Sequence, residues 1–106
     1  MSERKKIKLR NYDEWILTTL KNKEEAALYL QVAFDEFQDD GDTEALLLAL
    51  RHVADAQGGM ALLAKNTKLN RESLYRTLSS KGNPKLQTIG VLLKALGFKL
   101  SVSASQ

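Results

Sequence analysis

The sequence lacks several features that define large classes of proteins. Its 106 residues include no cysteine, which excludes both a disulfide framework and a thiolate metal site. No apolar run approaches the roughly 20 residues that a membrane-spanning helix requires. The charged start MSERKKIKLR is not followed by the apolar segment of a secretory signal. We therefore expect a cytoplasmic protein that makes no contact with membranes.

Candidate catalytic and metal-binding residues are also scarce. His52 is the single histidine, and it falls in a segment predicted to be a largely buried helix. No serine has a plausible base beside it, and no Gly-rich phosphate loop precedes a helix. The run Asp39-Asp40-Gly41-Asp42 lacks the remaining ligand spacing of a calcium loop and is typical of a turn with helix caps. The sequence predicts no enzymatic activity, no cofactor and no metal site.

Charge is distributed unevenly along the chain, although the net charge is only +3. Residues 1–10 hold five basic residues and one acid, residues 11–50 hold two lysines and ten acids, and residues 51–106 hold nine basic residues and two acids. The basic C-terminal half suits phosphate binding. The acidic block suits a basic protein partner, and a solvated helix face is the alternative explanation.

Helical periodicity predicts an all-α protein with a single small core. Asn22, followed by acidic residues, is typical of a helix start, and the predicted helix runs to about Phe37. Asp42 or Thr43 begins a second helix that reaches about Gln57. Its apolar stripe is wide, so we expect this second helix to be central and buried.

The segment after the last predicted helix is typical of a strand. That helix begins near Thr88 and is stopped by Gly97, after which Phe98, Leu100 and Val102 alternate with polar residues. A lone strand needs a pairing partner. The same strand of a second subunit would provide one, so these three residues are the predicted dimerisation contacts. A tail that lies on the helices is the alternative.

The N-terminal residues offer a second candidate contact surface. We divide the chain into a basic arm with a short helical extension (residues 1–21), a helical domain (22–97), and a C-terminal strand and tail (98–106). In the extension, Tyr12, Trp15 and Ile16 place apolar side chains beside the acidic block and are the predicted anchors for a protein partner. Packing of Trp15 into the core is the alternative.

The stretch from Gly59 to Leu78 predicts two short helices joined by a tight turn. The first covers Met60 to Lys65, and Asn70 is a suitable N-cap for the second, Arg71 to Leu78. This pattern is typical of a DNA-binding helix-turn-helix whose second helix enters the major groove. Similar helix pairs also occur in all-α proteins that do not bind nucleic acid.

The exposed positions of the second helix are the candidate DNA contacts. Arginine can donate two hydrogen bonds to guanine, and a glutamate can accept one from cytosine. The predicted base contacts are Arg71, Glu72, Tyr75 and Arg76. The predicted phosphate contacts are Lys65, Lys68, Ser73, Thr77, Lys81, Asn83 and Lys85. Glu72 has an alternative role, because it is spaced to pair with Arg76.

The run Arg71-Glu72-Ser73-Leu74-Tyr75-Arg76, followed by Gly82-Asn83-Pro84, is the most distinctive part of the sequence. With these residues the chain, from about Tyr12 to Val102, resembles the addiction-module antidote proteins, the helix-turn-helix antitoxins of bacterial type II toxin–antitoxin pairs. The resemblance implies a five-helix Cro/phage-repressor-like domain that neutralises a small, basic RelE/ParE-type toxin and represses its own operon. One departure is Lys68, which stands where such turns often carry Gly, so a left-handed backbone there would be strained.

Three functions are compatible with these observations. They are a DNA-binding antitoxin and autorepressor, a phage- or stress-type repressor without a toxin partner, and a helical protein-interaction module. One recognition helix reads only a few base pairs, so DNA binding predicts a homodimer on palindromic double-stranded operator DNA. A toxin bound to the N-terminal half would leave the recognition helix free, so that toxin and operator bind together.

Overall fold

A computed structural model describes residues 13–105, and within that range the chain forms helices and no strand. A short N-terminal helical segment spans residues 13–19. The helices that follow are α2 (Lys23–Asp40), α3 (Thr43–Ala56), α4 (Met60–Thr67), α5 (Arg71–Thr77) and α6 (Leu86–Ala95). The prediction of an all-α protein is confirmed.

Helix α2 begins where the sequence predicted and ends one turn later. The side chain of Asn22 accepts a hydrogen bond from the backbone N–H of Glu25 at 3.0 Å, which confirms the predicted N-cap. The helix continues past Phe37 because the left-handed conformation that ends it is taken by Gly41 (φ 69°), whose N–H donates to the Phe37 carbonyl oxygen. Glycine adopts this conformation without a steric cost.

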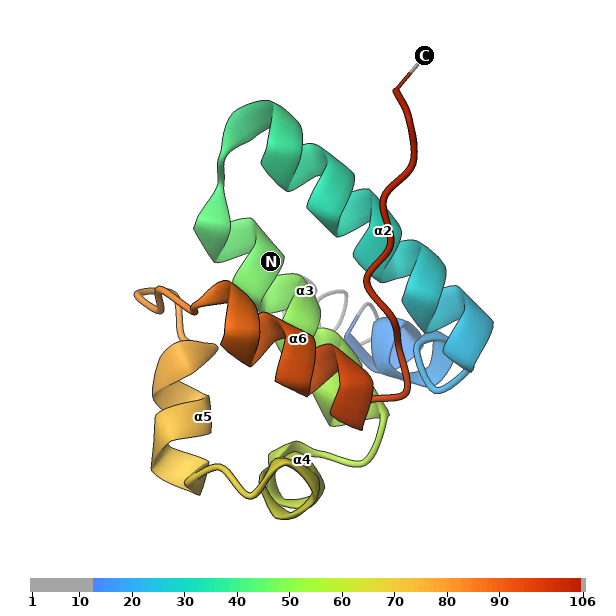
Figure 1. The fold of residues 1–106 in the computed structure, drawn as a ribbon. Coiled ribbons are helices and arrows are strands. Elements are labelled where there is room, and N and C mark those ends of the chain that lie inside the picture. Colours follow the sequence, from blue (N-terminus) through green and yellow to red (C-terminus); the bar gives the residue numbers. More distant parts are fainter. Residues whose placement is uncertain (1–12, 106) are drawn as a thin grey trace, which may run out of the picture.

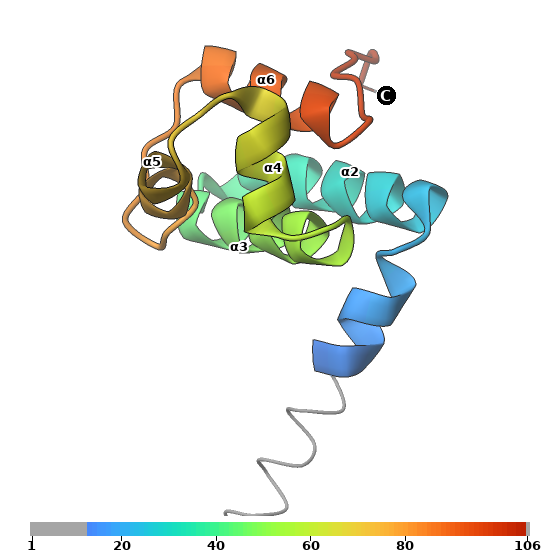
Figure 2. The same cartoon turned by 90° about the horizontal axis from the view of Figure 1, so that it is seen from below.

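Helix α3 forms the centre of the molecule, as predicted. Asp42 caps it by accepting a hydrogen bond from the N–H of Ala45 at 3.1 Å. Its buried residues are Leu46, Leu47, Ala49, Leu50, Val53 and Ala54. Helices α2 and α3 pack side by side in opposite directions, and α4 and α6 cover the rest of the core (Figures 1 and 2).

The N-terminal helical segment is anchored to this core. Ile16 and Leu20 are buried and belong to the same hydrophobic cluster as α3. The side-chain amide of Gln57, at the end of α3, donates hydrogen bonds to the carbonyl oxygens of Leu20 and Lys21 at 2.6 and 3.1 Å. The segment therefore packs on the helical domain, although it projects beyond the start of α2 (Figure 2).

The C-terminal residues form an extended tail, and the predicted strand is not formed in the described chain. The side-chain amine of Lys23 donates to the carbonyl oxygen of Leu96 and lies 5.1 Å from the centre of the Phe98 ring, so the start of α2 holds the end of α6. Beyond Phe98 the tail crosses α2 (Figure 1). A strand needs a neighbouring strand to pair with, and residues 13–105 supply none.

Candidate nucleic-acid interface

Helices α4 and α5 are joined by a turn of three residues, 68–70. Lys68 ends α4 with φ 61°, and among residues 13–105 it is the one non-glycine residue with a positive φ. This confirms the left-handed backbone that the sequence suggested at this position. A side chain in this conformation costs about 1–2 kcal/mol, so the rest of the unit must hold the turn in place.

Two side chains hold the turn through short local hydrogen bonds. The Thr67 hydroxyl donates to the Leu63 carbonyl oxygen at 2.8 Å and accepts from the N–H of Leu69 at 3.3 Å. The Asn70 side chain accepts from the N–H groups of Glu72 and Ser73 at 2.8 and 3.3 Å, which confirms the predicted N-cap of α5. This role of Thr67 was not predicted from the sequence. The one sequence feature that could have indicated it is the position of Thr67 directly before Lys68.

Apolar contacts fix the direction of α5. Leu74 and Leu78 lie on one face of the helix and are fully buried. Met60 and Leu63 of α4 are buried in the same cluster, and α4 contacts α3, α5 and α6. Leu69, in the turn, is 37% exposed and does not belong to this cluster. With one face of α5 fixed against the core, its opposite face is presented to solvent.

The four predicted base contacts lie on this outer face. Arg71, Glu72, Tyr75 and Arg76 are all exposed. The guanidinium of Arg71 lies 5.8 Å from the centre of the Tyr75 ring, which orients both side chains. Among the described residues Glu72 and Arg76 form no ion pair. The alternative role of Glu72, as a partner of Arg76, is therefore not seen in this structure. The surface thus offers two arginines and one carboxylate as donors and acceptors.

The candidate phosphate contacts come from the end of α4, the turn, α5 and the loop before α6. Lys65, Lys68, Lys81, Asn83 and Lys85 are exposed, whereas Ser73 and Thr77 are half-buried. Lys65 and Lys68 come from the end of α4 and from the turn, and the others outside α5 come from the loop before α6. Exposed lysines therefore both precede and follow the two exposed arginines along the chain.

The loop after α5 is held against the end of that helix. The Ser79 hydroxyl donates to the Arg76 carbonyl oxygen at 2.7 Å, and the N–H of Gly82 donates to the Ser79 carbonyl oxygen at 2.9 Å. Gly82 lies so close to the Thr77 carbonyl that a Cβ atom at this position would collide with it. Gly82 therefore holds its neighbours Lys81 and Asn83 next to α5. Any other residue at this position would force the loop to move.

Tyr75 also faces the N-terminal part of the chain. Together with Asp13, Leu17, Leu48 and Arg51 it lines a groove of about 400 Å³. A partner bound to the N-terminal segment was expected to leave the predicted recognition helix free. The structure instead brings residues 13–17 to the edge of the candidate interface.

The other predicted contact residues differ in their exposure to solvent. Ile16 is only 6% exposed, so it packs into the core and does not suit the predicted role of an exposed anchor. Its neighbour Trp15 is 60% exposed, whereas Tyr12 lies outside the described residues. In the tail, Phe98 is half-buried against the core of its own chain, while Leu100 and Val102 remain exposed.

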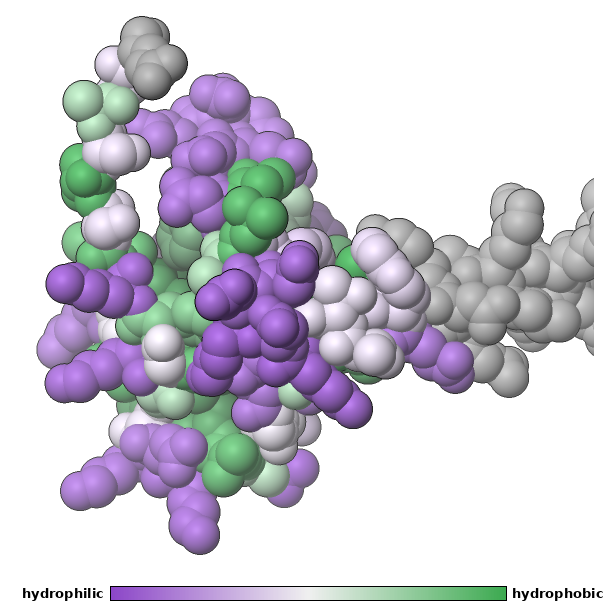
Figure 3. Space-filling view, turned by 90° about the vertical axis from the view of Figure 1, so that its right-hand side faces the viewer, coloured by the Kyte–Doolittle hydropathy of each residue, from purple (hydrophilic) through white to green (hydrophobic). Residues whose placement is uncertain are grey.

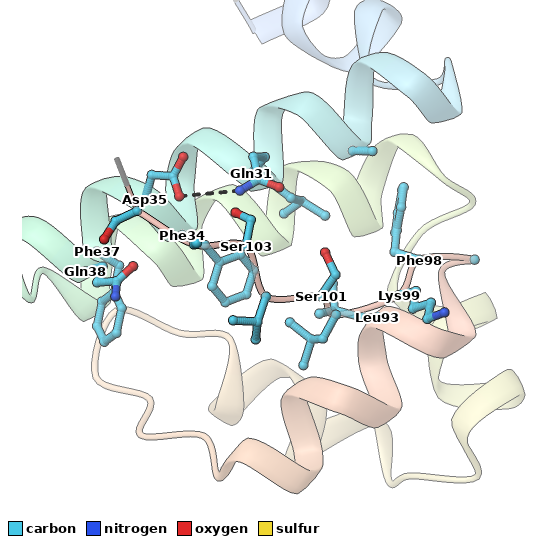
Figure 4. Close-up of a pocket in the computed structure, with 17 residues that line it drawn as sticks. Gln31, Phe34, Asp35, Phe37, Gln38, Leu93, Phe98, Lys99, Ser101 and Ser103 are labelled. Carbon is cyan, nitrogen blue, oxygen red and sulfur yellow. Dashed lines mark hydrogen bonds between the residues drawn. The ribbon is translucent and has the colours of Figure 1, made fainter.

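The tail covers an apolar groove of about 750 Å³ along α2. Phe34 and Phe37 of α2 and Leu93 of α6 line it (Figure 4). Within the described chain, residues 99–105 make no backbone hydrogen bond. The tail therefore keeps its backbone donors and acceptors available for a pairing partner, as the predicted dimerisation strand requires.

His52, the single histidine, has a structural role. The Tyr29 hydroxyl and the Nδ1 atom of His52 lie 2.9 Å apart and link α2 to α3.

In the part of the chain that the structure describes, no group of three His, Cys, Asp or Glu side chains is arranged to hold a metal ion. None of the described helices is long and apolar enough to cross a membrane.

These features define a small all-α protein that exposes a basic surface on a two-helix unit. Residues 8–104 match the family model described as "probable addiction module antidote protein", and the chain belongs to this family. It is also 33% identical, over 98 residues, to an uncharacterised protein of Haemophilus influenzae, a match that covers 92% of this chain and 94% of that protein. No solved structure matches the chain.

Proposed function

We propose that this protein is a DNA-binding antitoxin that neutralises a RelE/ParE-type toxin and represses its own operon. The observation that carries the proposal is the exposed face of α5, where Arg71, Tyr75 and Arg76 project from a helix fixed by buried leucines. Membership of the antidote family supplies the second part, because an antidote acts on a toxin.

The proposed DNA-binding role treats α4 and α5 as a Cro-like helix-turn-helix. Helix α5 enters the major groove, Arg71 and Arg76 contact base edges, and Lys65, Lys68 and Lys81 contact phosphates on either side. Two copies bind a palindromic operator, and antiparallel pairing of Leu100 and Val102 in the tails joins them. The unpaired backbone of residues 99–105 supports this mode of dimerisation.

The toxin-binding role follows from the acidic half of the chain. Residues 11–50 hold ten acids and two lysines, and a basic toxin is attracted to such a surface. Trp15 is an exposed aromatic side chain within this half and is the proposed N-terminal anchor. Ile16 and Leu20 anchor the same segment to the core.

An experiment in cells tests both roles together. The protein should silence a reporter under the promoter of its own operon and restore the growth of cells that express the neighbouring toxin gene. Arg71→Ala with Arg76→Ala should remove repression and leave growth rescue intact, because Trp15, the proposed toxin anchor, lies outside α5. A protein that does neither contradicts the proposal. Repression without rescue indicates a repressor that has no toxin partner.

A further inference from the structure

The outer face of α2 carries two exposed aliphatic side chains that the fold does not use. Ala26 and Leu30 bury the inner face of this helix. Leu28 and Val32 are 61% and 48% exposed. They are four residues apart and therefore neighbours on the helix surface. Single exposed aliphatic residues are common on protein surfaces, so the pair becomes informative only through its surroundings.

Carboxylates bracket this aliphatic pair at both ends. Glu24 and Glu25 precede Leu28 by one turn, Glu36 follows Val32 by one turn, and Asp39 follows Glu36 by three residues on the same face. All four are exposed, and no basic residue occurs in α2 after its first residue. We call the aliphatic pair and these four acids the α2 outer face.

The acids toward the end of α2 do not stabilise the helix. A helix C-terminus carries partial negative charge, so Glu36 and Asp39 are unfavourably placed. The last turn contains no basic residue, and within residues 13–105 neither acid forms an ion pair. These negative charges do not stabilise the fold of the single chain, but they would attract a basic partner.

The α2 outer face is accessible and lies away from the candidate DNA interface. The tail runs along a neighbouring side of α2, past Gln31, Phe34 and Asp35. Helix α3 covers the remaining side, where Tyr29 meets His52. On the side of the molecule seen in Figure 3, a small hydrophobic patch is surrounded by hydrophilic residues. Helices α2 and α5 lie on opposite sides of the fold (Figures 1 and 2).

We propose that the α2 outer face is the main docking surface for a basic protein, which is the toxin; this inference rests on the proposed antitoxin function. Leu28 and Val32 form the centre of the interface, where loss of water provides most of the binding energy. The surrounding carboxylates attract and orient the basic partner. Because α5 remains open on the other side, toxin and operator bind to the same antitoxin molecule.

The first test removes the aliphatic centre. The probe is the purified basic protein encoded beside this gene, and its affinity for the full-length antitoxin is measured by calorimetry. Leu28→Asp and Val32→Asp should each weaken binding by roughly tenfold or more. Val91→Asp is the matched control, since Val91 is an exposed (40%) valine within a helix, α6, and should bind like the wild type. Circular dichroism confirms that all three variants are folded.

The second test reverses charge without a loss of stability. Glu36→Lys combined with Asp39→Lys places cations near the C-terminus of α2, where they favour the helix. The melting temperature should stay the same or rise, while the association rate falls by about tenfold and depends less on salt. Asp55→Lys is the control, because this exposed acid lies on α3 outside the α2 outer face.

The outcomes distinguish a failure of the α2 docking surface from a failure of the toxin partnership itself. If the wild type binds the probe and the Leu28, Val32 and double-lysine variants bind equally well, the α2 outer face is not the docking surface, and the antitoxin function stands. If the wild type does not bind, both the toxin partnership and this inference are wrong. If the variants change only the self-association of the antitoxin, the face joins two copies of this chain and the inference is overturned.

Discussion

Gly82 lies against the backbone carbonyl of Thr77, at a distance that leaves no room for a side chain. This contact docks the loop before α6 onto the last turn of α5. It links the two groups of candidate DNA contacts, the arginines of the helix and the lysines of the loop. The position of Lys81 relative to Arg76 therefore depends on the absence of a side chain at Gly82.

Replacing Gly82 with alanine should displace this loop. The added methyl group meets backbone atoms that cannot rotate away, so we expect a loss of about 1–3 kcal/mol in the free energy of unfolding and weaker DNA binding. Gly90→Ala is the control, because Gly90 lies within α6 and an added Cβ meets nothing within 4 Å. Alanine there should stabilise the helix by about 0.5–1 kcal/mol. Chemical denaturation measures both, and equal stability of the two variants would contradict the contact.

Lys68 separates backbone strain from charge. Lys68→Gly should raise the free energy of unfolding by about 1 kcal/mol, because glycine takes the left-handed conformation at φ 61° without steric cost. Lys68→Ala removes the same charge and keeps the strain. If Lys68 contacts phosphate, both variants should lose DNA affinity to a similar extent. A Lys68→Gly protein that is no more stable than the alanine variant would show that the turn is not strained.

Base contacts and phosphate contacts should respond differently to mutation. Arg71→Ala and Arg76→Ala each remove a proposed bidentate base contact, so each should cost about 1–3 kcal/mol of binding free energy and relax the preference at one operator position. Lys81→Ala should weaken binding to every sequence by a similar factor. Binding measurements on a panel of single-base operator variants distinguish these effects. Equal, sequence-independent losses from all three substitutions would refute the assigned roles.

Local features of the fold were predictable from the sequence. Asn22, Asn70 and either Asp42 or Thr43 were expected to cap helices, and Asn22, Asp42 and Asn70 accept the capping backbone hydrogen bonds. Such bonds connect residues two or three positions apart, so the sequence contains all the information that they require. For the same reason Gly97, which follows α6 with φ 90°, was recognisable as a helix stop.

Contacts between distant parts of the chain were not predictable in this way. Trp15 and Ile16 are adjacent and both apolar, and only the position of α3 decides that Ile16 is buried while Trp15 is exposed. The link from Lys23 to Leu96 joins residues 73 positions apart. The alternating tail is compatible with a strand or with an extended segment, because a strand forms only where a second strand is present.

The most direct test of the account is the binding of the full-length protein to the DNA upstream of its own gene, measured at several salt concentrations. Lysine and arginine side chains that neutralise phosphates release counterions, so the logarithm of the affinity should fall linearly and steeply with the logarithm of the salt concentration. We predict a protein–DNA complex at low salt, with two antitoxin chains per operator and a slope that becomes shallower in Lys81→Ala. The absence of any complex on this DNA at low salt would contradict the central claim.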